Sequence, residues 1–179
     1  MSVFTNPASG SREHASAYIR AILDLLGAQD PNAVLKRTER ALRRAIDGLS
    51  RKQLTQPEAQ GKWSIRHVVQ HLADSELVWG YRLRTVLGHD RPVLTGYDQD
   101  SWAAQLHYDQ VDAGEALETF AALRRANLRL LGGLEPEELK RVGVHSERGD
   151  ESVEHMMKLY AGHDLLHLNQ IARIKKGVA

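Results

Sequence analysis

SVEHMMKLYAGHDLLHLNQIARIKK, residues 152–176, has the hydrophobic pattern most typical of a helix in a bundle. Its inward-facing positions recur in alternating steps of three and four residues, the spacing of a helix packed in a bundle. These positions are Val153, Met156, Tyr160, His163, His167, Gln170 and Ile174. The ends of this seam are apolar, but its middle is His, His and Gln. Burying an imidazole costs free energy unless its nitrogens are bonded, so folding alone would place Leu or Ile there.

Helix start and stop signals recur through the rest of the chain. Asp30-Pro31 has the form of a cap followed by a first-turn proline, Ser64 can cap a further helix, and Asp112 with Glu115 resembles a capping box. The pattern predicts helices over residues 14–26, 31–48, 64–87, 112–131 and 152–176, and a short one over 102–106. Residues 89–101 and 135–150 are expected to be loops, the second with a helical turn, and no strand hairpin is predicted.

These segments together predict an all-α fold, a four-helix bundle with long crossing loops and short extra helices. No Gly/Pro/Ser-rich linker divides the chain. We therefore expect residues 1–12 to form a flexible tail and residues 13–179 to form a single domain.

Composition narrows the functional classes. Lys and Arg number 24 and Asp and Glu 23, so the net charge of +1 predicts neither nucleic acid nor a membrane as partner. The absence of cysteine excludes disulfides, Cys-ligated zinc, iron–sulfur clusters and a protein thiol nucleophile. No apolar run approaches the length of a membrane span, and the N-terminus lacks an apolar signal core, so a cytoplasmic location is expected.

The histidines are the candidate chemistry. His163 and His167 lie one helical turn apart on one face, a spacing that suits a single metal ion. His71, with His67 four residues before it, lies on the inward edge of the helix predicted over residues 64–87, so positions on two helices could converge. Three neutral imidazoles bind Zn, Ni or Fe without cancelling the charge of the ion, and they leave coordination open for water or substrate. The alternative is that each is an ordinary hydrogen-bonded core histidine. The missing HExxH glutamate argues against a zinc metalloprotease.

Four segments carry a family resemblance. GKWSIRHVVQHLADSE (residues 61–76), RPVLTGYDQDSWA (91–103), VGVHSERGDES (142–152) and LYAGHDLLHLNQI (159–171) resemble the signature segments of the DinB-like superfamily. They are most similar to its YfiT branch of metal-dependent hydrolases and bacillithiol-transferase-like proteins. The likeness covers about residues 18 to 175.

The resemblance implies a four-helix bundle, a homodimer and one divalent transition metal per chain. The ligands carried over by motif are His71, which precedes Leu-Ala-Asp, and the two histidines of the last segment, His163 and His167. His67 falls where the family pattern requires no histidine, so we expect it at the boundary of the fold.

Residues outside the proposed ligand set have the following predicted roles. Asp74 could orient a ligand imidazole or be an exposed carboxylate, and Gln170 could line the pocket or hydrogen-bond across the bundle. The loop with Tyr97, Asp98 and Trp102 could cover the site, with Trp102 expected in the core. His145 is expected at the surface rather than acting as an acid or base. The remaining predictions are solvent positions for His14, His89, His107 and His155, and a solvated helix face, or an anion site, for Arg124, Arg125 and Arg129.

The leading functional prediction is a metal-dependent enzyme that transfers a low-molecular-weight, bacillithiol-like thiol onto an electrophilic small molecule. One alternative is a hydrolase in which bound hydroxide is the nucleophile. Another is a non-enzymatic metal-binding stress-response protein. The sequence identifies no catalytic acid or base.

Overall fold

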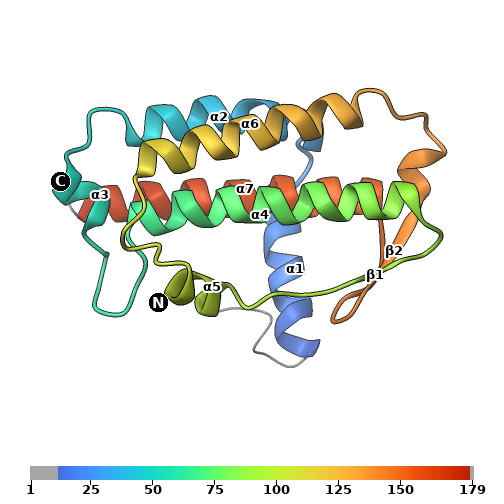
Figure 1. Ribbon diagram of the computed structural model, residues 1–179, viewed down its shortest axis with the longest axis horizontal. Coiled ribbons are helices and arrows are strands. Elements are labelled where there is room, and N and C mark those ends of the chain that lie inside the picture. Colours follow the sequence, from blue (N-terminus) through green and yellow to red (C-terminus); the bar gives the residue numbers. More distant parts are fainter. Residues whose placement is uncertain (1–11, 178–179) are drawn as a thin grey trace.

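The computed structural model describes the backbone of residues 12–177 and the side chains of residues 16–177. Most of the predicted tail therefore lies outside the described residues. In the described part, four long helices form a bundle, and an earlier helix crosses them (Figure 1). The bundle consists of α2 (Pro31–Ile46), α4 (Ile65–Gly88), α6 (Ala113–Leu131) and α7 (Val153–Gly177). The crossing helix is α1 (Arg12–Leu26), which packs on α7. The predicted all-α four-helix bundle is confirmed.

Local signals account for most of the helix starts. Asp30 accepts hydrogen bonds from the backbone N–H groups of the first turn of α2, and Asp112 does the same for α6. Ser64 precedes α4 as predicted, but its hydroxyl is 2.7 Å from Nδ1 of His67 and makes no cap bond. A short helix that the sequence analysis did not predict, α3 (Arg51–Thr55), begins with a reciprocal capping box between Ser50 and Gln53.

A small sheet corrects the expectation that the chain has no hairpin. β2 (Val142–His145) pairs antiparallel with β3 (Gly149–Ser152), and β1 (Val93–Leu94) pairs parallel with β2. The strands lie largely within the two predicted loops, and the helical turn predicted for the second loop is η2 (Glu138–Lys140). The short helix predicted over residues 102–106 is α5 (Gln99–Gln105), which begins three residues earlier. Strands this short lack a readable alternation, and β1 lies about fifty residues before its partner, so no local pattern announces the sheet.

The core is divided into two apolar clusters by a polar layer. One cluster centres on Leu35, Trp79 and Met156, and the other on Phe120 and Ile171. On α4, α6 and α7 the residues between the two clusters are buried polar side chains, listed here: Ser75, Glu76, Arg124, Asn127, Asp164 and His167. The functional candidates on α7 therefore lie in the middle of the bundle.

Arg124 belongs to this layer and not to a solvated face, which corrects the prediction. It is 1% exposed, and its Nη1 lies 2.6 Å from Asp164 Oδ2 while its Nη2 lies 2.8 Å from Glu76 Oε2. Nη1 also donates to the Leu35 carbonyl, so one guanidinium joins α6 to α2, α4 and α7. Arg125 is exposed as predicted.

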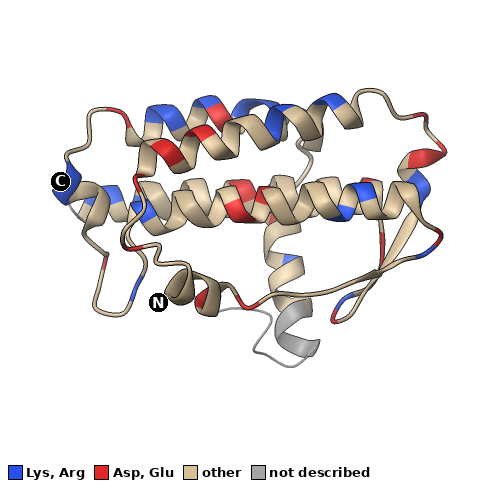
Figure 2. Ribbon diagram, in the orientation of Figure 1, with Lys and Arg blue, Asp and Glu red and all other residues tan. Residues whose placement is uncertain are grey.

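On the outer helices the charges are mixed. Figure 2 shows basic and acidic residues interspersed along α2 and α6. None of the helices in the described part of the chain is both long and apolar enough to cross a bilayer.

Candidate metal centre

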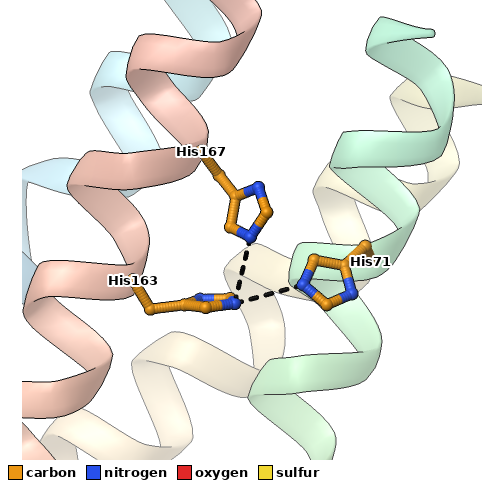
Figure 3. A group of neighbouring side chains, drawn as sticks. All are labelled: His71, His163 and His167. Atoms are coloured by element: carbon orange, nitrogen blue, oxygen red, sulfur yellow. Dashed lines mark hydrogen bonds between the residues drawn. The ribbon is translucent and has the colours of Figure 1, made fainter. Parts of the chain in front are cut away.

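Three imidazoles meet between α4 and α7 (Figure 3). Nε2 of His163 lies 3.1 Å from Nε2 of His71 and 3.1 Å from Nε2 of His167. One possible ligand atom from each residue lies within 4.8 Å of the other two. Nitrogens that share one ion at about 2.1 Å are about 3.0 Å apart at right angles and about 3.4 Å apart in a tetrahedron. The two separations of 3.1 Å therefore match those of ligands to a common ion.

A hydrogen bond orients one of the rings. Nδ1 of His167 lies 2.8 Å from Oε1 of Gln170, one turn further along α7. An amide oxygen only accepts, so Nδ1 carries the proton and Nε2 presents its lone pair to the cluster. Partners of this kind fix the tautomer of metal-bound histidines. Gln170 thus bonds within its own helix, and not across the bundle.

All three rings are neutral at pH 7. Burial lowers the pKa of His71 and His163 well below the usual value, and lowers that of His167 to about 4. Neutral imidazoles are the form that binds a metal. The donor set of three nitrogens with no carboxylate fits a first-row transition ion, and among the described residues it is the single such cluster.

A cavity of about 90 Å³ reaches two of these rings, His71 and His163. Its walls come from α1, α4, α7, the loop after β1 and the β2–β3 turn. Its lining includes Tyr18, Ile22, Ser75, Arg82, Tyr97, Glu147, Arg148 and Tyr160. A small molecule in this cavity can therefore approach the cluster.

The close approach of α1 to the centre depends on Gly162. A Cβ at this position would lie 2.1 Å from the carbonyl oxygen of Ile22, far inside van der Waals contact. The backbone of α1 thus packs directly against α7 beside His163, and it forms one wall of the cavity.

The predicted covering loop contributes Tyr97 directly. Its hydroxyl lies 2.9 Å from Ser75 Oγ, which in turn is 3.4 Å from Nε2 of His71. Trp102, expected in the core, is instead half-buried, and its ring centroid lies 4.4 Å from that of Tyr97. Asp98 caps α5 through the N–H groups of Asp100 and Ser101.

Two predicted roles differ in the structure. Asp74 accepts hydrogen bonds from Gln70 and Tyr108, so its partners are these side chains and not a ligand imidazole. His145 is 1% exposed in β2, not at the surface, and its Nδ1 accepts from the Glu147 N–H at 3.2 Å. It lies outside the three-histidine cluster.

The other histidines fall broadly where expected. His67 is half-buried and bonded to Ser64, and His89 and His107 are exposed. His155 is half-buried rather than fully solvated, and the side chain of His14 lies outside the described residues.

Sequence reasoning missed two arginines of the cavity, Arg82 and Arg148, and it placed Tyr160 on the inward seam without a role at the site. Arg82 and Tyr160 both line the cavity, and Nη1 of Arg82 donates to the Tyr160 hydroxyl at 3.4 Å. Arg148 pairs with the buried Glu151. The one available signal was that Arg82 follows Ser75 by seven residues and His71 by eleven, which keeps all three on one stripe of the helix.

A helical bundle with three histidines converging in its interior defines a protein built to hold a metal ion. The sequence pattern of the DinB superfamily matches residues 35–171, and the chain belongs to this superfamily. A Bacillus cereus relative named "putative metal-dependent hydrolase" is 30% identical over 173 residues, covering 97% of this chain and 92% of the relative. An Oceanobacillus iheyensis protein with the same description is 31% identical over 137 residues, covering 76% of this chain and 79% of its own.

A solved structure agrees on the fold. YfiT from Bacillus subtilis, described as "a probable metal-dependent hydrolase with an unusual four-helix bundle topology", superposes with a TM-score of 0.76. It covers 97% of this chain and 92% of its own, at 24% identity.

Proposed function

We propose that this chain is a divalent-metal-dependent enzyme that activates a small-molecule thiol for attack on an electrophile. The observation that carries the proposal is a three-nitrogen cluster, His71, His163 and His167, that opens onto a cavity. A metal site with a purely structural role is closed by its ligands, whereas three protein ligands beside a cavity leave room for a guest. This geometry favours an enzyme over a non-enzymatic metal-binding protein.

Different residues of the chain would hold the ion and orient its ligands. The three imidazoles would hold the ion, and Gln170 keeps the His167 ring in the tautomer that donates its Nε2 lone pair. A divalent ion held by neutral ligands lowers the pKa of a thiol or water beside it, because none of its charge is cancelled. The chain supplies no cysteine, so a thiol must come from the substrate.

The lining of the cavity favours thiol chemistry. Glu147 is the single carboxylate among the lining residues, and Asp74 bonds to Gln70 and Tyr108. Attack by water usually relies on a positioned general base, whereas a thiol with a lowered pKa loses its proton to solvent. The sulfur electron pair then forms the new bond to the electrophilic carbon as the leaving group departs with its own pair.

Hydrolysis is the second candidate, and the description shared by the relatives in Bacillus cereus and Oceanobacillus iheyensis favours it. In that reaction water takes the place of the thiol at the same cluster. The two candidates differ in nucleophile and not in site.

One experiment separates them. The purified protein is loaded in turn with Zn²⁺, Ni²⁺ and Fe²⁺ and offered cysteine with monochlorobimane, in parallel with a panel of esters and amides. We expect metal-dependent formation of the thioether with release of chloride, abolished in His163→Ala and retained in His89→Ala, whose histidine is exposed. Hydrolysis without conjugation would establish the second candidate. Metal binding without either reaction would refute both.

A further inference from the structure

Arg82 is a buried cation that forms no ion pair with a carboxylate of residues 16–177. It is 5% exposed, and it donates hydrogen bonds from Nη2 to the Thr95 carbonyl at 2.5 Å and from Nη1 to the Tyr160 hydroxyl at 3.4 Å. Both acceptors are uncharged. Two of the five guanidinium N–H groups are thereby engaged, which leaves donors for a further partner.

The rest of the chain shows how unusual this is. Arg82 and Arg124 are the two arginines classed as buried within residues 16–177, and Arg124 binds both Glu76 and Asp164. Arg148, which shares the cavity with Arg82, binds Glu151 through two hydrogen bonds. Burying a charge is costly unless the charge is paired, and the chain pairs its other deeply placed arginines.

The carboxylates near Arg82 form no direct ion pair with it. Glu151 lies close enough for the charge of Arg82 to favour its ionised form, but its two oxygens are already taken by Arg148. Glu147 lines the cavity and forms no ion pair with another described residue. Its carboxylate comes close to Gly96, where a Cβ would lie 2.7 Å from Oε1, so it is associated with the loop after β1.

Arg82 also has a defined position relative to the imidazoles. It lies on the same stripe of α4 as His71 and Ser75, three turns or about 16 Å along the axis from His71. Its side chain and that of His71 both line the cavity. A molecule that contacts both side chains has its charged group at Arg82 and its reacting atom at His71. The part of the molecule between them lies against the apolar residues Ile19, Ile22 and Leu159 of the cavity wall.

We propose that Arg82 binds an anionic oxygen group, a carboxylate or a phosphate, of the substrate whose reacting atom lies at the three histidines. The substrate is thus an anionic small molecule with an apolar middle section. The reacting-atom part of this inference rests on the proposed function, whereas the anion site itself does not require the metal reaction. Arg82 would make the site specific for anionic substrates, because the substrate's anionic group forms the ion pair that the protein itself does not provide.

The test compares matched ligands on the full chain as purified, with its metal content measured. Hexanoate, hexanamide and hexyl phosphate are titrated and followed by ligand-observed NMR. We expect hexanoate or hexyl phosphate to bind more tightly than the neutral amide. Arg82→Gln is expected to weaken anion binding by about 10- to 100-fold, the worth of a charged hydrogen bond, without changing hexanamide binding. The tighter of the two anions identifies the group.

Two further variants keep the result interpretable. Arg82→Lys retains the charge without the planar fork and is expected to keep part of the affinity, which covers the case in which Arg82→Gln fails to fold. Arg125→Gln removes an exposed arginine of the same charge and is expected to bind all three ligands as the wild type does. Equal binding of hexanoate and hexanamide, or unchanged anion binding in Arg82→Gln, would overturn the inference. If the purified chain holds no metal but still binds the anions through Arg82, only the proposed function is contradicted.

Discussion

Replacing Arg124 with methionine tests whether the buried ionic layer holds the bundle together. The guanidinium is the shared partner of two carboxylates, Glu76 and Asp164, each 1% exposed, and it donates to a backbone carbonyl of α2. Methionine fills much of the volume but leaves both carboxylates without their cation. Breaking a buried pair from one side costs about 3–5 kcal/mol. In a chain of this length the melting temperature should fall by roughly 6–20 °C.

The pH dependence gives a second and sharper readout. Burial raises the pKa of Glu76, and the charge of Arg124 opposes this effect. Without Arg124 the pKa rises further, so the folded variant takes up a proton more readily than the unfolded chain. The deficit of the variant should therefore shrink as the pH falls from about 8 to about 5.

The assay is urea unfolding followed by circular dichroism on metal-free protein at pH 8 and pH 5. Arg125→Met is the control, because its arginine is one position away but exposed, and it should lose less than about 0.5 kcal/mol. If Arg124→Met lost no more than this control, or if its deficit did not depend on pH, the reasoning about the ionic layer would be refuted.

Four further outcomes are expected. His163→Ala should abolish stoichiometric metal binding in elemental analysis, while His89→Ala, at an exposed position, retains it. Gln170→Leu should fold normally but bind metal about 10- to 100-fold more weakly in a competition titration, because leucine cannot accept the hydrogen bond that keeps the proton of His167 on Nδ1; unchanged affinity would contradict this. Burial lowers the pKa of His145 to about 4, so its contribution to stability is complete above about pH 6.5, and up to about 3 kcal/mol of it is lost as the pH falls to about 4; His145→Gln should make the measured loss of stability over that range smaller by up to this amount, while the three clustered histidines keep their own share of the loss. Gly162→Ala should lower the urea midpoint and open the cavity to larger ligands, since a methyl group there cannot coexist with the present path of α1; wild-type stability would show that α1 shifts without cost.

Much of the fold and of the candidate site was readable from the sequence because the relevant signals are local. The seam on α7 repeats within one helix, and the caps at Asp30 and Asp112 act on the next three residues. The placement of His163 and His167 on one face follows from four-residue spacing alone. The bundle and the pairing of two imidazoles on one helix were therefore predictable without tertiary information. The helical pattern also placed His71 on an inward edge, and the family resemblance selected it over His67 as the third ligand.

The long-range partners of the buried side chains were not predictable from local sequence signals. From the sequence Arg124 was predicted to be solvated, because its carboxylate partners lie 40 and 48 residues away on other helices. Arg82 has no sequence feature that distinguishes it from other helix charges, and its role depends on the cavity that surrounds it. The sheet of β1, β2 and β3, and with it the burial of His145, depends on a pairing across about fifty residues. Periodicity shows which face of a helix is buried. The packing of distant segments determines which groups meet on that face. A buried charge is stabilised by its neighbours in space and not by its neighbours in the chain.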